Sequence, residues 1–249
     1  MEEAELWPED DVALYEPDEN EQVLLYEYAD CVSARAFLKM CPLPFKVEHR
    51  PNAEHMSPSG HVPFLKVGKL VVADFLPIVD VVARKGIRLS DDLADFEKAD
   101  MHAHLALVQQ VLRNAEMYVC WMHEHVCQLT YRRYGSVYSW PLNRLLPFLK
   151  KRQIVSTLAA FGWADKTVEE VLFEVSKCCK ALSMKLGGKN YFCGDSPTEL
   201  DALVFGHLYT ILTTELPDVD LANVVKHHAN LVEFCKRVDK AYFVRKLMI

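Results

Sequence analysis

The fold of this chain is decided by residues 56–78, MSPSGHVPFLKVGKLVVADFLPI. Two short runs of β-forming residues, Phe64–Val67 and Leu70–Val72, are joined by Gly68-Lys69. A two-residue turn in which glycine supplies a positive φ is typical of a β-hairpin. We predict that a helix opens at Asp74 and runs to about Arg84. The Val62-Pro63 step before the hairpin can hold a cis peptide bond, which leaves the N–H and C=O of Val62 unpaired at the surface.

The segments before this stretch predict the rest of a small α/β domain. Val23–Tyr26 is predicted to be a strand, Ser33–Met40 a helix that ends before Pro42, and Phe45–His49 a second strand. With the hairpin and the helix from Asp74, the predicted order is β-α-β-β-β-α, which is typical of thioredoxin-like domains. We therefore assign residues 1–21 to an acidic N-terminal tail and residues 22–85 to a thioredoxin-like domain.

The remainder of the chain is predicted to be helical. Residues 86–95 form a linker, with Ser90 as a plausible N-cap, and residues 96–249 form an all-helical C-terminal domain. Thr167 with Glu170, and Thr198 with Asp201, each place a hydroxyl at an N-cap and a carboxylate three residues later, the pattern of a capping box. The apolar run after Thr198 predicts a central, buried helix. The predicted fold class is α+β.

Composition limits the range of functions. The 249 residues carry a net charge of −7, and the eight cysteines include no Cys-x-x-Cys pair, which favours free thiols in a reducing compartment. The first basic residue is Arg35, so we expect no mitochondrial presequence. No stretch is apolar enough over about 18 residues to span a bilayer, so we expect any membrane contact to be peripheral.

The charge is unevenly distributed. No acidic residue occurs between Glu124 and Asp165, although the chain as a whole is acidic. Basic residues mixed with aromatics can bind nucleic acid, an anionic membrane or an acidic partner; the acidic remainder of the chain argues against nucleic acid. The alternative is that these residues form two ordinary helix surfaces. We predict contacts to a partner or to membrane headgroups from Arg132, Arg133, Tyr138, Trp140, Arg144, Lys150, Lys151 and Arg152.

The first domain resembles that of the glutathione transferase family, in which an acidic residue or Gln followed by Ser opens the helix after the hairpin. The Ser hydroxyl and the helix N–H groups of that family bind the carboxylate of glutathione. Here the pair is Asp74-Phe75, and phenylalanine has no donor. The resemblance implies a degenerate glutathione site made of Cys31, Val62, Asp74 and Phe75, with Pro63 as the cis-proline.

Longer runs resemble the metaxin family more specifically. They are Trp7-Pro8-Glu9 and residues 52–60, 134–143 and 197–214. The resemblance implies a non-enzymatic subunit on the cytosolic face of the mitochondrial outer membrane. It would act in protein import and β-barrel sorting with a metaxin-1-like protein and the sorting and assembly machinery. It would also be an adaptor to a Miro-class GTPase and a kinesin complex. Because the C-terminal sequence is short and basic, attachment is expected through the partner.

Two sets of residues suggest other chemistries, a reactive thiol and a zinc site. Cys31 falls about where thioredoxin-like domains keep a reactive thiol at a helix N-terminus, so a degenerate glutathione-dependent transferase or thiol enzyme is the alternative function. Asp30 opposes a thiolate there, and the simpler interpretation is an inert cysteine. Cys120, His123, Glu124 and Cys127 share one face of a continuous helix and are types that bind zinc. Structural zinc ligands usually come from several elements, so we expect no metal, no cofactor and no catalytic residue.

Overall fold

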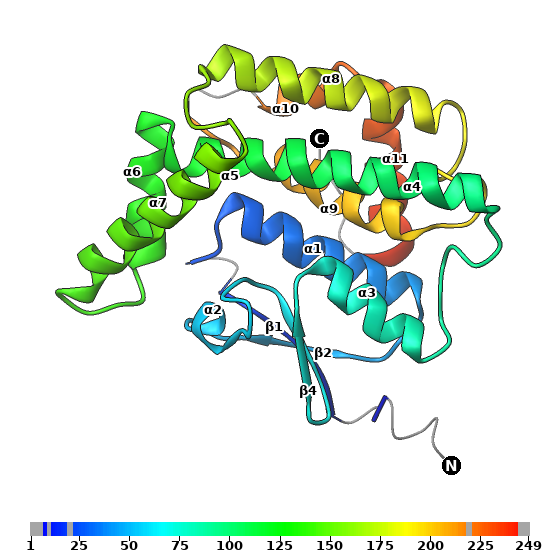
Figure 1. Ribbon diagram of the computed structural model, residues 1–249, viewed down its shortest axis with the longest axis horizontal. Coiled ribbons are helices and arrows are strands. Elements are labelled where there is room, and N and C mark those ends of the chain that lie inside the picture. Colours follow the sequence, from blue (N-terminus) through cyan, green and yellow to red (C-terminus); the bar gives the residue numbers. More distant parts are fainter. Residues whose placement is uncertain (1–6, 9–10, 19–21, 218–220, 244–249) are drawn as a thin grey trace.

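A four-stranded mixed sheet forms the N-terminal part of the molecule (Figure 1). The computed structural model describes residues 7–8, 11–18, 22–217 and 221–243. The strand order is β2-β1-β3-β4, with β1 parallel to β2 and antiparallel to β3, and with β3 antiparallel to β4. The strands are β1 (Val12–Glu16), β2 (Lys46–His49), β3 (Phe64–Val67) and β4 (Leu70–Ala73).

Three helices complete this domain, and two of them separate the sheet from the rest of the molecule. Helices α1 (Leu25–Met40) and α3 (Phe75–Arg84) lie between the sheet and the helical domain (Figure 1). The buried side chains of Leu14 and Leu65 join their core. The four-residue α2 (Ala53–Met56) belongs to a separate small apolar cluster, in which the Tyr15 ring stacks on Phe64.

The strand predicted at Val23–Tyr26 is wrong. The first strand is Val12–Glu16, inside the stretch assigned to an acidic tail, because Val12, Leu14 and Glu16 alternate with less buried residues. Leu25 and Tyr26 instead form the first turn of α1, where the Leu24 N–H donates to a Glu27 carboxylate oxygen at 3.3 Å. Helix α1 therefore begins at Leu25 rather than at Ser33. The later predictions in this domain, the hairpin and the helix after Asp74, are confirmed.

The second domain is helical, as predicted. Helix α4 begins after Ala94, whose N–H donates to the Glu97 carboxylate at 3.0 Å; Ser90, the predicted N-cap, instead donates its hydroxyl to Glu199. The elements are α4 (Asp95–Val108), a π-helical segment (Gln109–Arg113), α5 (Asn114–Trp121), α6 (Glu124–Gly135), α7 (Leu142–Ala160), α8 (Val168–Leu186), α9 (Glu199–Thr213), α10 (Leu221–Lys226) and α11 (Ala229–Tyr242).

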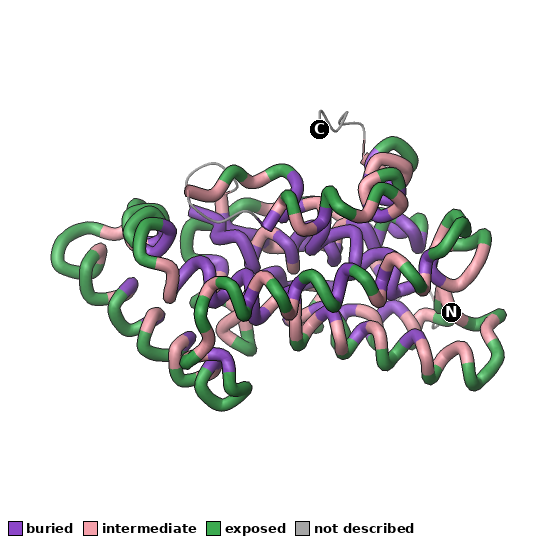
Figure 2. The backbone as a smooth tube through the Cα atoms, turned by 90° about the horizontal axis from the view of Figure 1, so that it is seen from above, coloured by how far each residue is buried: buried purple, intermediate pink, exposed green. Residues whose placement is uncertain are grey.

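Nearly all residues of helix α9 are buried, and buried residues fill the middle of the molecule (Figure 2). Helix α9 packs against α1 across the boundary between the domains. A Cβ atom on Gly206 would meet the Ser33 Oγ at 2.0 Å and the Ala29 carbonyl oxygen at 2.6 Å, so glycine permits this close approach. The Ser33 hydroxyl donates to the Ala29 carbonyl at 2.8 Å and lies 3.3 Å from the Leu203 carbonyl. The two domains are thus joined by a tightly packed pair of helices.

Carboxylates stabilise the starts of α8 and α9. The Thr167 hydroxyl accepts from the Glu170 N–H at 3.3 Å, and the Thr167 N–H donates to the Glu170 carboxylate at 2.8 Å. Asp201 accepts from the Thr198 N–H at 2.8 Å and also from the Phe192 N–H at 2.9 Å. Asp201 therefore holds the preceding loop as well as the helix start.

Candidate functional site

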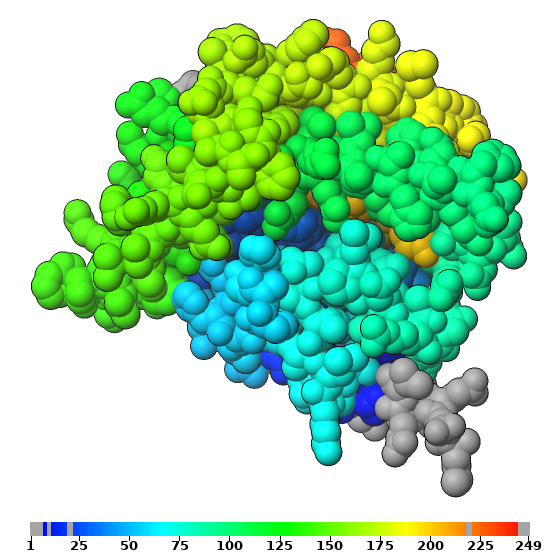
Figure 3. All heavy atoms as spheres, viewed as in Figure 1, coloured from blue at the N-terminus to red at the C-terminus, as the bar shows by residue number. Residues whose placement is uncertain are grey.

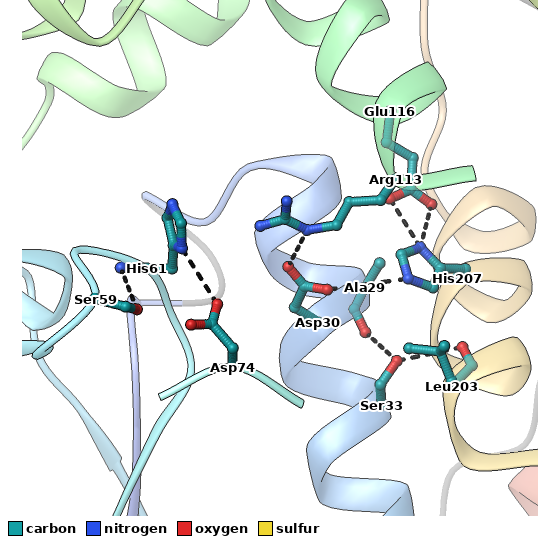
Figure 4. A network of polar contacts seen from close by, with 10 residues as sticks. All are labelled: Ala29, Asp30, Ser33, Ser59, His61, Asp74, Arg113, Glu116, Leu203 and His207. Atoms are coloured by element: carbon teal, nitrogen blue, oxygen red, sulfur yellow. Dashed lines mark hydrogen bonds and ion pairs between the residues drawn. The ribbon is translucent and has the colours of Figure 1, made fainter. Parts of the chain in front are cut away.

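The start of α3 is where a glutathione transferase would bind its substrate. The Val62-Pro63 peptide bond is cis, and Asp74 caps α3 with a positive φ of 69°. The Asp74 carboxylate lies 3.2 Å from the His61 ring (Figure 4), and this contact lowers the pKa of Asp74. Phe75 is buried with its ring edge against Phe37, their centroids 5.8 Å apart. An aromatic ring in the core therefore occupies the position where the family has a hydroxyl.

The other residues of the predicted degenerate site are also closed off. Val62 is 3 % exposed, so its backbone is not an open edge of the sheet. Cys31 lies in the second turn of α1, not at a helix N-terminus, because that helix begins at Leu25. It is 1 % exposed, and burial raises the pKa of its thiol well above the usual range. A reactive thiolate needs the opposite conditions.

A buried polar network connects α1 with α5 and α9 (Figure 4). Arg113, at the end of the π-helical segment, donates from Nε to Asp30 at 3.0 Å, and Asp30 raises the pKa of the guanidinium. His207 on α9 lies 2.9 Å from Glu116 and 3.9 Å from Asp30. Burial opposes the charged form of His207, but the Glu116 carboxylate outweighs it and raises the pKa of His207. This network stabilises the domain boundary, and of its residues Asp30 was named from sequence, as a carboxylate that opposes a thiolate at Cys31.

A second polar contact joins α2 to the helical domain. Glu54 accepts from the Tyr134 hydroxyl at 2.9 Å and forms an ion pair with Lys150. The His55 ring lies 3.1 Å from the Tyr138 hydroxyl. Lys150 is only 5 % exposed. Sequence reasoning missed Glu54, and no sequence signal distinguishes it from other surface carboxylates of this acidic chain.

The structure divides the eight basic and aromatic residues predicted to bind a partner or membrane. Lys150 is not a surface charge but the buried partner of Glu54, so its assignment to the exposed surface is wrong. Lys151 is half-buried and donates to the Cys127 sulfur at 3.3 Å, and Tyr138 packs beside Tyr134. The remaining five are exposed on the hairpin of α6 and α7: Arg132, Arg133, Trp140, Arg144 and Arg152.

A groove lies between α6 and α7. It has a volume of 1130 Å³ and includes Tyr131, Leu145 and Phe148, with Arg132 and Arg144 also lining it. The candidate zinc ligands near this hairpin do not share one helical face, because the helix breaks at Met122-His123 between Cys120 and Cys127. No metal-binding cluster of three or more His, Cys, Asp or Glu residues occurs in the described ranges.

Comparisons with known proteins agree with this architecture. The family described as Glutathione S-transferase N-terminal domain matches residues 29–126, and the Glutathione S-transferase C-terminal domain matches residues 175–238. Glutathione transferase GSTFuA3 from Phanerochaete chrysosporium superposes with a TM-score of 0.61 at 16% identity, covering 94% of this chain and 98% of that one. Glutathione transferase F7 from Populus trichocarpa gives 0.58 at 14% identity over 93% and 95%. The chain has a glutathione transferase-like fold.

Sequence relatives define the family more narrowly. Metaxin-2 of Homo sapiens is 49% identical over 241 residues, 96% of this chain and 91% of that protein. A metaxin-2 homolog of Caenorhabditis elegans is 44% identical over 205 residues, 82% of this chain and 89% of that protein. Metaxin-1 of Mus musculus is 27% identical over 87% of this chain and 70% of that protein. The chain belongs to the metaxin family. Within the part that the structure describes, no helix has both the length and the hydropathy needed to cross a bilayer.

Proposed function

We propose that this protein is a non-enzymatic subunit on the cytosolic face of the mitochondrial outer membrane, acting in protein import and β-barrel assembly with a metaxin-1-like partner. The observation that carries the proposal is the buried Phe75 ring at the start of α3 in a chain of the metaxin family. In glutathione transferases a side-chain hydroxyl at that helix start adds a donor for the anion to the backbone N–H groups, and the Phe75 side chain has no donor.

The closed domain boundary adds a second argument. Glu54 of α2 is bonded to Tyr134 and Lys150 of the helical domain, and Arg113 is bonded to Asp30 of α1. These contacts pair polar groups with one another across the domain boundary. A chain that keeps the fold without a hydroxyl at the start of α3 retains surfaces for binding other proteins.

The proposal is tested first by ligand binding. The purified protein should give no heat on titration with glutathione and should not conjugate glutathione to a reactive aromatic halide. Cys31→Ser is the matched control, since a thiol enzyme would lose turnover in that variant. Thiol-dependent turnover abolished by Cys31→Ser would establish the alternative, a glutathione-dependent enzyme.

Location and partners need a separate experiment. Carbonate at high pH should extract the protein from mitochondria, and protease added to intact organelles should degrade it. Copurification should recover a metaxin-1-like protein together with the sorting and assembly machinery. The adaptor role is tested in the same eluate, where it requires a Miro-class GTPase and a kinesin complex. A protein recovered only from the matrix would refute the proposed location.

A further inference from the structure

The hairpin of α6 and α7 projects from one side of the molecule (Figure 3). Its tip, residues 136–141, is at the left of Figure 1, and within it Tyr138 contacts His55 of α2. Trp140 at this tip is 80 % exposed, whereas the other three tryptophans of the chain, Trp7, Trp121 and Trp163, are buried. A large apolar side chain at a projecting tip is available to a surface outside the molecule.

Further exposed apolar side chains continue from the tip along α7. Leu142, Leu145 and Leu149 recur at intervals of three and four residues, which places them on one face of the helix. Phe148 is exposed beside them. Contiguous apolar surface on a soluble domain marks a binding surface, whereas isolated exposed residues do not.

The charge on the same hairpin has one sign. Residues 125–164 contain no Asp or Glu. Arg132, Arg144 and Arg152 are exposed, and the described residues offer none of them an ion pair. The net charge of the whole chain is −7, so an anionic surface would be attracted to this hairpin and repelled by most other faces.

The groove between the two helices combines both properties. Leu145 and Phe148 give it an apolar lining, and Arg132 and Arg144 add two guanidinium groups. A groove with these two properties is complementary to an amphiphile that has an anionic head and an apolar body. Tryptophan and leucine combined with arginine are typical of segments that lie in the interface of a bilayer.

We propose that the α6–α7 hairpin docks on a surface of anionic phospholipids, with Trp140 and the leucines of α7 in the interface and Arg132, Arg144 and Arg152 against the phosphates. This inference deepens the proposed function and rests on its peripheral location. It assigns to lipid the contact that the sequence left open between a partner and membrane headgroups.

The first test measures binding to vesicles. The full chain should cosediment with vesicles of equal parts phosphatidylcholine and phosphatidylserine, and binding should weaken as salt is raised. It should bind phosphatidylcholine vesicles far less. The triple variant Arg132→Glu, Arg144→Glu, Arg152→Glu should reduce partitioning by at least about 100-fold, because each basic residue near an anionic surface contributes about fivefold and each new glutamate adds repulsion.

A control variant with the same change in net charge separates a local effect from a global one. Three exposed lysines lie on α8, α10 and α11: Lys180, Lys226 and Lys240. Within the described residues, none of them forms a hydrogen bond or an ion pair. Replacing these three by Glu should reduce vesicle binding much less. Equal loss in both triple variants would mean that only net charge matters, and it would overturn the docking site.

The second test uses the single exposed tryptophan. On addition of anionic vesicles, the fluorescence of Trp140 should shift to shorter wavelength and become protected from a water-soluble quencher. The Trp140→Ala variant should lose this signal and bind more weakly, while Phe173→Ala, which removes a similarly exposed ring from α8, should do neither. An unshifted, fully quenchable Trp140 in the bound state would contradict the proposed orientation.

One further outcome separates this inference from the proposed function. If the Arg triple variant binds anionic vesicles normally but fails to recover a metaxin-1-like partner, the hairpin is a protein-binding surface and the lipid proposal is wrong. The proposed import function would survive that result. Conversely, vesicle binding that depends on the hairpin would stand even if the protein were absent from mitochondria.

Discussion

At the scale of single residues, Phe75 is a core side chain at the position where glutathione transferases have a serine hydroxyl. Its ring packs on Phe37, so Phe75→Ser would remove an aromatic contact and leave a cavity beneath α3. We expect this change to lower the free energy of unfolding by about 3–5 kcal/mol, measured by denaturant titration. The neighbouring Leu76 is 38 % exposed, and Leu76→Ser should cost much less.

The same variant tests whether the substrate position can be restored. Phe75→Ser should still fail to bind glutathione, because the Val62 edge remains buried and Asp74 remains bonded to His61. Calorimetry with glutathione would detect a gain. A variant that binds glutathione and keeps its unfolding midpoint would show that Phe75 is only a plug in an otherwise intact site.

Glu27 makes stability depend on pH. Burial raises the pKa of Glu27 to about 7, above its ordinary value of 4.5. Between these pH values the unfolded chain releases a proton that the folded protein keeps, so the free energy of unfolding falls as pH rises from about 4.5 to about 7. The fall should reach roughly 3 kcal/mol. Denaturant titrations at several pH values should show it.

Glu27→Gln is the variant that isolates this effect. An amide oxygen can still accept from the Leu24 N–H, and the charge is gone, so the variant should be more stable than the parent at pH 8 and nearly equal at pH 4.5. Burial raises the pKa of Asp201 to about 6. In the Glu27→Gln variant, Asp201 should therefore still make the free energy of unfolding fall with rising pH, but by less. If the free energy of unfolding of Glu27→Gln fell with pH as steeply as that of the parent, the pH dependence would come from other groups.

At the scale of elements, the crossing of α1 and α9 depends on a missing side chain. Gly206→Ala would place a methyl group within 2.6 Å of the Ala29 carbonyl oxygen, which the backbone of α1 cannot avoid. We expect the variant to lose about 2–3 kcal/mol of stability by overpacking, although alanine favours a helix intrinsically. Gly188→Ala meets no atom within 4 Å and should be neutral. Equal midpoints for the two variants would show that the crossing is loose.

The capping contacts at the starts of α8 and α9 are expected to contribute different amounts to stability. Thr167→Ala removes one exposed capping bond and should cost about 0.5–2 kcal/mol. Asp201→Ala leaves two backbone N–H groups, those of Phe192 and Thr198, without their acceptor in a buried place. That loss should reach about 2–4 kcal/mol, because each unsatisfied buried group carries its own desolvation cost. Thermal unfolding of the two variants would rank them.

Local sequence predicted the elements whose signals are local. Glycine at the hairpin turn, the cis step at Val62-Pro63 and the hydroxyl before each capping carboxylate act within a few residues, and those elements occur where expected. The first strand was misplaced because Val23–Tyr26 and Val12–Glu16 are both short and partly apolar. Only pairing with β2 and β3 decides between them, and that pairing is a long-range property.

The candidate surface was predicted in part for a similar reason. Composition located the basic, aromatic segment, but burial of Lys150 depends on Glu54, which lies 96 residues away in the chain. Asp30 and Arg113 are likewise distant in sequence and meet only in the folded state. Which charges of an acidic chain become paired at a domain boundary could not be predicted from sequence alone.

At the scale of the whole molecule, Glu54 and Lys150 tie the two domains together. Lys150→Met would leave the Glu54 carboxylate without its cation near the buried Glu27, so we expect a loss of about 3 kcal/mol. Lys151→Met, at the half-buried neighbouring position, should cost less than 1 kcal/mol. The unfolding midpoint measures both. Similar midpoints would mean that water replaces the ion pair.

The packing of α1 on α9 through Gly206 has a consequence for orientation. The boundary between the two domains is filled by two helices whose backbones nearly touch. Sheet, helical body and projecting hairpin therefore turn together as one block. If the hairpin is bound to a surface, the exposed edge of β2 therefore has a fixed orientation and a fixed distance relative to that surface. A partner that binds the edge of β2 would be held in the same orientation.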